Sequence, residues 1–353
     1  MGAVRGATLG PIESTLHPGV GYGTPASAEA LDEMVALGCN WVSITPFGRL
    51  WDLRTTEIQM NFEAPFDQNR AAVVRVIEQA HARGLRVLLV PHLWVDAGGW
   101  RGQIEPGTEE GWQRWFASYE RFVVEWARVA EQAHAEMLSI GVEMKSSSDT
   151  HVHQWIGVIE AIRRAYSGLL TYSANWDEEG LVGFWDRIDV VGINAFYPLA
   201  EHDGAELEVL RAGARERARR LRTWAERNDR AVMFTEFGYT ARPDPAVRPW
   251  EWPEDLVGVR VDAHAQAVAY RALLEAFVGE SWFVGGFVWR YYANPMDASQ
   301  EAAWGFSPRL REAEDVLREL YAARWGSDAD RGRLLFGNGR DASLQLETRW
   351  FAR

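Results

Sequence analysis

Short β-branched apolar runs alternate with amphipathic helical stretches along the chain, eight of each. Each apolar run is too short for a helix and too continuously apolar for a strand that has one face in water. Such runs are typical of parallel strands that are buried on both faces. The predicted strands are 6–12, 40–47, 86–94, 136–144, 169–176, 188–198, 231–239 and 283–292.

Helix signals fill the intervals between the predicted strands. The first predicted helix, 27–38, begins at Ser27 and ends at Gly38, residue types that favour the two ends of a helix. In 109–134, apolar side chains recur every three or four residues, which predicts a wide apolar face that covers a sheet. The other predicted helices are 67–84, 150–166, 206–228, 260–279 and 308–323, with a short one near 179–187.

This alternation predicts an α/β fold with a parallel sheet and right-handed crossovers. Eight units favour closure into a single (β/α)8 TIM barrel over an open sheet, and no Gly-x-Gly-x-x-Gly follows the first strand to indicate a dinucleotide-binding fold. A chain of 353 residues is long enough for one such barrel. We expect residues 1–325 to form the barrel and residues 326–353 to form a short C-terminal extension packed on it.

Charge and composition exclude several classes of partner. Acidic residues outnumber basic ones by 50 to 37, a formal net charge of −13, so neither nucleic acid nor an anionic membrane is an expected partner. The single cysteine, Cys39, cannot form an internal disulfide. No apolar stretch reaches the roughly 18 residues of a membrane span, and residues 1–13 lack the apolar core of a signal peptide. We therefore expect a cytoplasmic protein, or a secreted one whose leader has been removed.

Long connections follow four of the predicted strands, at 46–66, 95–108, 240–259 and 290–307. In a (β/α)8 barrel the connections that follow the strands build the active-site face. They carry the tryptophans Trp51, Trp100, Trp250, Trp252 and Trp304, and Trp94 stands directly before the second of them. The sequence therefore predicts long loops and an aromatic cleft on the C-terminal face of the barrel.

Two glutamates stand at the ends of predicted strands, Glu143 on the fourth and Glu236 on the seventh. Because side chains alternate between the two faces of a strand, Glu143 is predicted to share a face with Gly141, and Glu236 with Phe234. If both faces point inward, the two carboxylates meet in the mouth of the barrel.

A pair of carboxylates in this position suits the cleavage of a glycosidic bond. One carboxyl protonates the departing oxygen while the other attacks the anomeric carbon, and a separation of about 5 to 5.5 Å gives a retaining enzyme. The alternative is that each glutamate only pairs with an arginine at the rim of the barrel. The position of both at strand C-terminal ends favours the catalytic interpretation.

Five short motifs lie at or near predicted strand ends: Pro91-His92-Leu93-Trp94, Trp100-Arg101-Gly102, Ile140-Gly141-Val142-Glu143, Asn194-Ala195-Phe196-Tyr197-Pro198 and Phe234-Thr235-Glu236-Phe237-Gly238-Tyr239. In their order and strand placement the sequence resembles glycoside hydrolase family 113, a β-mannanase family of the clan of (β/α)8 barrels with catalytic residues on strands four and seven. The resemblance covers residues 6 to about 325. It implies hydrolysis of β-1,4-linked mannan or manno-oligosaccharides without a cofactor.

The resemblance also implies individual roles. Glu143 would be the general acid/base and Glu236 the nucleophile. Trp289, near the end of the eighth strand, would stack beneath the reacting sugar, because a tryptophan face suits the apolar C–H groups of a pyranose. Tyr197 would hydrogen-bond the nucleophile. The alternatives are that Trp289 is a core side chain of an apolar strand and that Tyr197 is an aromatic residue before a turn proline.

One position departs from the pattern of the clan. Many members place an asparagine immediately before the acid/base, where it holds the 2-hydroxyl of the sugar, whereas Val142 stands there in this chain. We expect another polar side chain to bind this hydroxyl, with Asn175, Asn194 and His92 as the candidates. The mannan assignment therefore rests on the family resemblance and not on this position.

Further residues near strand ends are predicted to line the cleft. His92 and Trp94 share one face of the third strand, and Asn175 and Trp176 end the fifth, where substrate contacts are expected. Arg49 follows the second strand and is predicted to keep the nucleophile ionised by charge pairing. The alternative for Arg49 is a solvated loop arginine, and His92 has the alternative of a hydrogen bond within the barrel.

Other functions remain open at this point. Another β-glycosidase or transglycosidase of the same clan would use the same carboxylates, and a non-catalytic carbohydrate-binding barrel would keep the aromatic cleft. A Schiff-base aldolase needs a lysine in the mouth, and Lys145 is the only lysine of the chain. His151 and His153 diverge on a predicted helix, so no metal site is expected. The expected partner is an oligo- or polysaccharide substrate.

Overall fold

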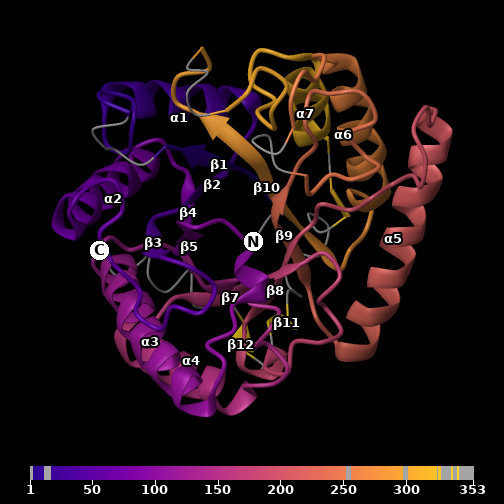
Figure 1. Ribbon diagram of the computed structural model, residues 1–353. Helices are drawn as coiled ribbons and strands as arrows, with labels where there is room; N and C mark the ends of the chain where they lie inside the picture. The colour runs from indigo at the N-terminus through magenta and orange to yellow at the C-terminus, as the bar shows by residue number, and fades with distance from the viewer. Residues whose placement is uncertain are drawn as a thin grey trace.

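A computed structural model of the chain describes residues 3–11, 17–251, 256–296, 301–323, 325–326, 335–336 and 340–341. Eight parallel strands close into a barrel in the order β1-β10-β9-β8-β7-β6-β4-β2. Helices surround the strands as a ring (Figure 1), which confirms the predicted (β/α)8 barrel. The barrel strands are β1 (Val4–Gly10), β2 (Trp41–Ile44), β4 (Arg86–Leu89), β6 (Met137–Val142), β7 (Leu169–Asn175), β8 (Val190–Asn194), β9 (Val232–Phe237) and β10 (Phe283–Tyr292).

The helices follow the predicted order. Helix α1 begins before the predicted start because Thr24, rather than Ser27, accepts a hydrogen bond from the first turn, and it ends at Gly38 in the left-handed conformation (φ 101°). Between β7 and β8 the predicted short helix 179–187 is reduced to the 3₁₀ turn η2 (Trp185–Arg187). The α-helices of the described residues are α1 (Pro25–Leu37), α2 (Phe66–His81), α3 (Glu109–Gln132), α4 (Val152–Ala165), α5 (Leu207–Asn228), α6 (Ala263–Phe277) and α7 (Glu312–Ala322).

Two predicted strands, 40–47 and 86–94, are each divided in two. Pro46 and Pro91 stand at the breaks. A proline has no N–H to donate to a strand ladder, so the barrel pairing stops there. The second halves, β3 (Phe47–Leu50) and β5 (His92–Val95), then pair with each other as a small parallel sheet. This sheet continues the chain beyond the C-terminal ends of β2 and β4 and carries several of the predicted site residues.

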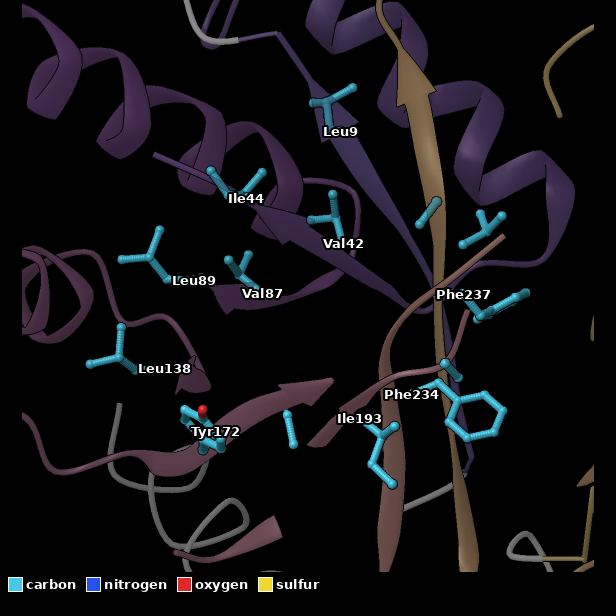
Figure 2. Packing of buried hydrophobic residues seen from close by; sticks show 14 of the residues in the cluster. Leu9, Val42, Ile44, Val87, Leu89, Leu138, Tyr172, Ile193, Phe234 and Phe237 are labelled. Atoms are coloured by element: carbon cyan, nitrogen blue, oxygen red, sulfur yellow. The ribbon is translucent and has the colours of Figure 1, made fainter. Parts of the chain in front are cut away.

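Buried apolar side chains form two layers. The outer layer fills the space between the strands and the helices, and Leu9, Val42, Leu89 and Phe234 belong to it (Figure 2). The inner layer receives at least one side chain from every barrel strand: Val4, Trp41, Leu88, Val90, Met137, Val142, Leu169, Val190, Met233, Val284 and Phe287. Because most of these residues lie near strand beginnings, they fill the N-terminal part of the barrel and leave the C-terminal mouth to polar groups.

The chain beyond α7 is described only in part. Trp325 is buried and stacks on Phe283 of β10, with ring centroids 6.0 Å apart. The short strands β11 (Leu335–Phe336) and β12 (Arg340–Asp341) pair antiparallel. Most of the predicted extension 326–353 lies outside the described residues, so its packing on the barrel stays a prediction. Within the ranges given above, no helix combines the length and the apolar character that crossing a bilayer requires.

Candidate active site

Glu143 follows β6 at a point where the strand is irregular. The pairing of β6 with β7 shifts register between Ser139 and Val142. Gly141 faces the helices, since a Cβ added there would lie 2.9 Å from Trp155 of α4. The predicted common face of Gly141 and Glu143 is therefore wrong, because a bulge reorients the end of the strand. Glu143 itself adopts the left-handed conformation, with φ 52°.

Glu236 lies in β9 at a second irregularity. Ile193 of β8 stands opposite Phe234, but the next residue, Asn194, stands opposite Glu236, so β9 has one extra residue here. Phe234 belongs to the outer layer and packs on Phe277 of α6, with ring centroids 4.8 Å apart (Figure 2). The predicted common face of Phe234 and Glu236 is therefore wrong as well. The bulge turns Glu236 away from the helix layer.

Asn194, at the end of β8, connects the two strand ends. Its Nδ2 donates to Oε1 of Glu143 at 3.0 Å. Its Oδ1 accepts from the hydroxyl of Thr235 at 2.9 Å. An ionised carboxylate only accepts, so the amide nitrogen faces Glu143, and the hydroxyl of Thr235 supports this orientation by donating to the amide oxygen.

The second oxygen of Glu143 contacts the loop after β5. Oε2 accepts from Nε1 of Trp100 at 2.8 Å and from Nη1 of Arg101 at 3.3 Å. These residues begin the 3₁₀ turn η1 (Arg101–Gln103). Together with Asn194, three donors from two different parts of the chain hold the carboxyl group of Glu143 in one orientation.

His92 lies between Arg101 and Glu236. Burial lowers the pKa of His92 well below its ordinary value, and the positive charges of Arg101 and Arg290 lower it further, so the ring is neutral at pH 7. Nη2 of Arg101 lies 3.3 Å from Nδ1 of His92. An arginine only donates, so Nδ1 accepts and the ring proton is on Nε2. Nε2 lies 3.2 Å from Oε1 of Glu236, and since the ring is neutral this contact is not an ion pair.

The carboxyl group of Glu236 is buried beside two arginines. Burial raises the pKa of Glu236 to about 7, and the nearby charges of Arg101 and Arg290 and a hydrogen bond from Asn194 limit the rise. Arg290 is itself buried and its guanidinium lies over the ring of Trp289, 5.1 Å from the centroid. The two cations therefore oppose the cost of placing a negative charge at Glu236.

One row of aromatic rings begins at His92. Trp289 stacks on His92 with ring centroids 6.0 Å apart, and it packs with Phe196 and Phe306 in a cluster separate from the main core. Trp176 packs against this cluster and stacks on Trp250 at 5.5 Å, with the rings 14° from parallel. Trp250 is 47% exposed, so one face of this stack is open to solvent.

A second row of rings leads along the small sheet. The ring of Phe47 lies 5.2 Å from His92 and 5.0 Å from Phe62, and Phe62 lies 6.4 Å from Trp94. Trp94 is 44% exposed. Exposed tryptophans thus occur at the ends of two separate rows of rings that both begin at His92. Trp252, also predicted to lie in the cleft, is outside the described residues.

The family model of glycoside hydrolase family 113 matches residues 16–305 of the chain. The chain belongs to glycoside hydrolase family 113. It is a glycoside hydrolase with a (β/α)8 barrel, as the sequence motifs indicated. None of the curated proteins is similar enough in sequence to match it.

Solved structures of family 113 superpose on the whole barrel. One is the β-mannanase AaManA from Alicyclobacillus acidocaldarius in complex with ManMIm, which is 28% identical, with a TM-score of 0.79 and coverage of 91% of this chain and 98% of the other. A β-1,4-mannanase of the family is 25% identical, with a TM-score of 0.77 and coverage of 92% and 100%. A family 5 mannosidase from Rhizomucor miehei, 12% identical with a TM-score of 0.61 and coverage of 91% and 92%, shares the fold.

Tyr197 of this family 113 chain does not reach Glu236. Its ring packs on Phe234 at 5.9 Å and on Phe277 at 6.5 Å, within the outer apolar layer. The bulge in β9 separates the two predicted partners, because Phe234 points toward the helices while Glu236 points toward the mouth. The predicted hydrogen bond between Tyr197 and the nucleophile is therefore wrong.

Arg49 is not the cation beside Glu236. It donates to both carboxylate oxygens of Asp96, at 2.8 and 3.0 Å, and its side chain is 42% exposed. The division of the second predicted strand explains the difference, because Arg49 lies in the small sheet opposite Trp94 rather than in the barrel. Arg101 and Arg290 take the role that was predicted for it.

Asp177 engages two other candidates. The side chain of Asn175 donates to Asp177 at 2.7 Å, and Nζ of Lys145 lies 2.6 Å from the same carboxylate. About a third of the Lys145 side chain is exposed. An aldolase lysine must be desolvated to lose its proton near pH 7, so this ion-paired lysine does not fit that role.

Arg101, Thr235 and Arg290 were not among the predicted site residues, and Trp100 was predicted only as one of the aromatic residues of the cleft. Trp100 and Arg101 belong to a quoted motif, but nothing local indicates that their long loop returns to Glu143. Arg290 did carry a signal, because an arginine inside an apolar strand is rarely buried without a specific partner. Among the described residues, no group of three or more histidine, cysteine, aspartate or glutamate side chains is arranged to hold a metal ion.

Proposed function

We propose that the chain is a retaining β-mannanase that cleaves β-1,4-linked mannan or manno-oligosaccharides by double displacement. The observation that carries this proposal is the convergence of Glu143, which follows β6, and Glu236 of β9 on the amide of Asn194 at the end of β8. Membership of family 113 and the likeness to β-1,4-mannanases support the choice of mannan.

The first step forms a covalent intermediate. Oε1 or Oε2 of Glu236 attacks the anomeric carbon while Glu143 gives its proton to the glycosidic oxygen. The glycosidic C–O bond breaks, the departing sugar leaves with the proton as a hydroxyl group, and an ester bond joins the remaining sugar to Glu236. Arg101 and Arg290 assist this step, because their charges favour the ionised form of the attacking carboxyl.

The second step releases the sugar. Glu143, now ionised, takes a proton from a water molecule, whose oxygen attacks the anomeric carbon from the side that the first sugar left. The ester bond breaks and Glu236 returns as a carboxylate. Two inversions give net retention, which requires the carboxyl groups to be about 5 to 5.5 Å apart.

His92 is the side chain that binds the 2-hydroxyl in place of the absent asparagine before Glu143. Nε2 of His92 and Oε1 of Glu236 are both buried and have no hydrogen-bond partner, although they lie 3.2 Å apart. A hydroxyl group both accepts and donates, so the 2-hydroxyl would take the proton of Nε2 and donate to Glu236. Asn175 is committed to Asp177 and is the poorer candidate.

Aromatic faces hold the remaining sugars. Trp289, beside His92, supplies a face for the reacting ring, and the exposed faces of Trp94 and Trp250 supply platforms farther along the two rows of rings. Platforms at the ends of two separate rows of rings fit a substrate of several sugar units.

Time-resolved product analysis tests the proposal. The wild type and Glu236→Ala are incubated with β-1,4-linked manno-, gluco- and xylo-oligosaccharides, and the anomer that appears first is recorded. We expect cleavage of the manno series alone, β-anomer first, and none by the variant. Binding without turnover by either protein would instead identify a carbohydrate-binding barrel, and longer products would identify a transglycosidase.

A further inference from the structure

The backbone of Glu143 is held in a conformation that residues with side chains rarely adopt. Its φ of 52° lies in the left-handed region. Two hydrogen bonds fix the chain on either side of this residue. The N–H of Glu143 donates to the carbonyl of Ser173 at 2.8 Å, and the N–H of the next residue, Met144, donates to the hydroxyl oxygen of Tyr172 at 2.8 Å. The direction of the Glu143 side chain therefore depends on a side-chain hydroxyl.

Tyr172 supports Glu143 from behind the barrel wall. It lies on β7 and its side chain belongs to the buried outer layer (Figure 2), so it does not reach the mouth. Its hydroxyl donates to Oε1 of Glu178 at 3.3 Å. Because that proton is used by Glu178, a lone pair of the hydroxyl faces the N–H of Met144.

Glu178 is a fully buried carboxyl group that the reaction does not use. Oε1 also accepts from the hydroxyl of Ser148 at 2.8 Å, and Oε2 accepts from the N–H of Asn175 at 2.8 Å. Burial raises the pKa of Glu178 to about 7, and the hydrogen bonds from these donors and from Tyr172 limit this rise. Ser148 lies in the loop after β6 and Asn175 ends β7, so this one carboxyl ties the two loops together.

We propose that Glu178, acting through Tyr172, is a positioning residue that sets the angle from which Glu143 delivers its proton to the glycosidic oxygen. This inference rests on the proposed function, because it assigns a role in the acid-assisted step. Glu178 and Tyr172 touch neither substrate nor reacting atoms. Their loss leaves the nucleophile and the sugar platforms in place and displaces only the proton donor.

The role predicts a dependence on the leaving group. A sugar leaves only with a proton, whereas 2,4-dinitrophenolate leaves without one. The value of kcat/KM reports the steps up to formation of the covalent intermediate. It is therefore unaffected by the second step, in which Glu143 acts as a base. Displacing Glu143 therefore lowers kcat/KM for mannotetraose and spares kcat/KM for 2,4-dinitrophenyl β-mannobioside.

The experiment compares these two substrates in the wild type, Tyr172→Phe and Glu178→Gln. Tyr321→Phe is the matched control, because this buried tyrosine also uses its hydroxyl in a hydrogen bond to the barrel, to the carbonyl of Gly6 at 2.8 Å. We expect kcat/KM for mannotetraose to fall about 10- to 100-fold in the first two variants, and for the dinitrophenyl substrate less than about threefold. In Tyr321→Phe neither value changes by more than about threefold.

An equal fall on both substrates in Tyr172→Phe and Glu178→Gln would overturn the positioning role and leave the proposed function standing. The positioning role would also be overturned if kcat/KM for mannotetraose fell no further in these two variants than in Tyr321→Phe. Should Tyr172→Phe fail to fold, Glu178→Gln decides alone. A wild type that cleaves neither substrate would refute the proposed function, and the positioning role with it.

Discussion

Nε2 of His92 lies 3.2 Å from Oε1 of Glu236, yet the two atoms are not aligned as a hydrogen bond and neither has another partner. Buried polar atoms without partners are costly, and they are concentrated at sites that complete their bonding with a ligand. The pair therefore points to a substrate hydroxyl that contacts both atoms at once, accepting from Nε2 and donating to Oε1.

Removal of the His92 ring nitrogen is expected to abolish recognition of the 2-hydroxyl. In His92→Phe, kcat/KM for an aryl β-mannoside falls about 10- to 100-fold, the range for a hydrogen bond within a charged network. The same variant and the wild type should differ by less than about threefold on the matching 2-deoxy substrate, which lacks the hydroxyl. Equal losses on both substrates would show that the ring only packs.

The amide of Asn194 should matter for rate far more than for stability. In Asn194→Ala, both carboxylates lose a donor, and we expect kcat/KM to fall about 100-fold or more. Asn40→Ala is the control: Asn40 bonds the backbone of Arg5 and Ala3 near the strand beginnings. That variant should lower Tm and leave kcat/KM within about threefold, and a similar loss of rate in both variants would contradict the assignment.

The pH profile of kcat/KM should have its acidic limb near the pKa of Glu236, about 7. The nucleophile must be ionised, so activity falls about tenfold per pH unit below this value. Arg101→Met removes a positive charge that favours the carboxylate, and the limb moves to higher pH. Arg49→Met removes a cation that pairs with Asp96 instead, so its limb stays where it is. A limb that stays fixed in Arg101→Met, or moves equally in both, would count against this electrostatic role.

Burial of Glu236 should cost stability above neutral pH. The pKa of Glu236 is about 7 in the folded protein, about 2.5 above the ordinary value of 4.5. The folded state therefore favours the neutral carboxyl group. Its contribution to the free energy of unfolding is complete below about pH 4.5 and is lost as the pH rises through about 7. At about 1.4 kcal/mol per pH unit, the loss reaches at most about 3.5 kcal/mol. Glu236→Gln should therefore raise Tm relative to the wild type at pH 8 and not at pH 5. An equal difference in Tm at both values would exclude the titration as its cause.

The exposed face of Trp250 should bind a sugar remote from the cleaved bond. In Trp250→Ala we expect KM to rise about tenfold for manno-oligosaccharides of five or more units, the equivalent of about 1.4 kcal/mol. Substrates of two or three units serve as the internal control, because we expect them to end before they reach this platform. A rise in KM that is independent of chain length would remove Trp250 from the binding surface.

The sequence by itself determined the barrel and predicted which two carboxylates lie at its mouth. Alternation of apolar runs with helical periodicity is a local pattern, and it predicted the eight units and the long loops that follow the strands. Glu143 and Glu236 were recognisable because they end apolar runs where parallel strands open into a mouth. Even the division of two strands has a local cause in Pro46 and Pro91.

Only the tertiary structure decided how the site is assembled. Bulges in β6 and β9 aim the two glutamates, and they arise from the register between neighbouring strands. The bulge in β9 also separates Tyr197 from Glu236. Arg49 pairs with Asp96, and Arg101 pairs with Glu143, because the fold brings these residues together. Residues far apart in the chain become neighbours only when the barrel closes, and hydrogen-bond partners are selected by that closure rather than by the sequence around each residue.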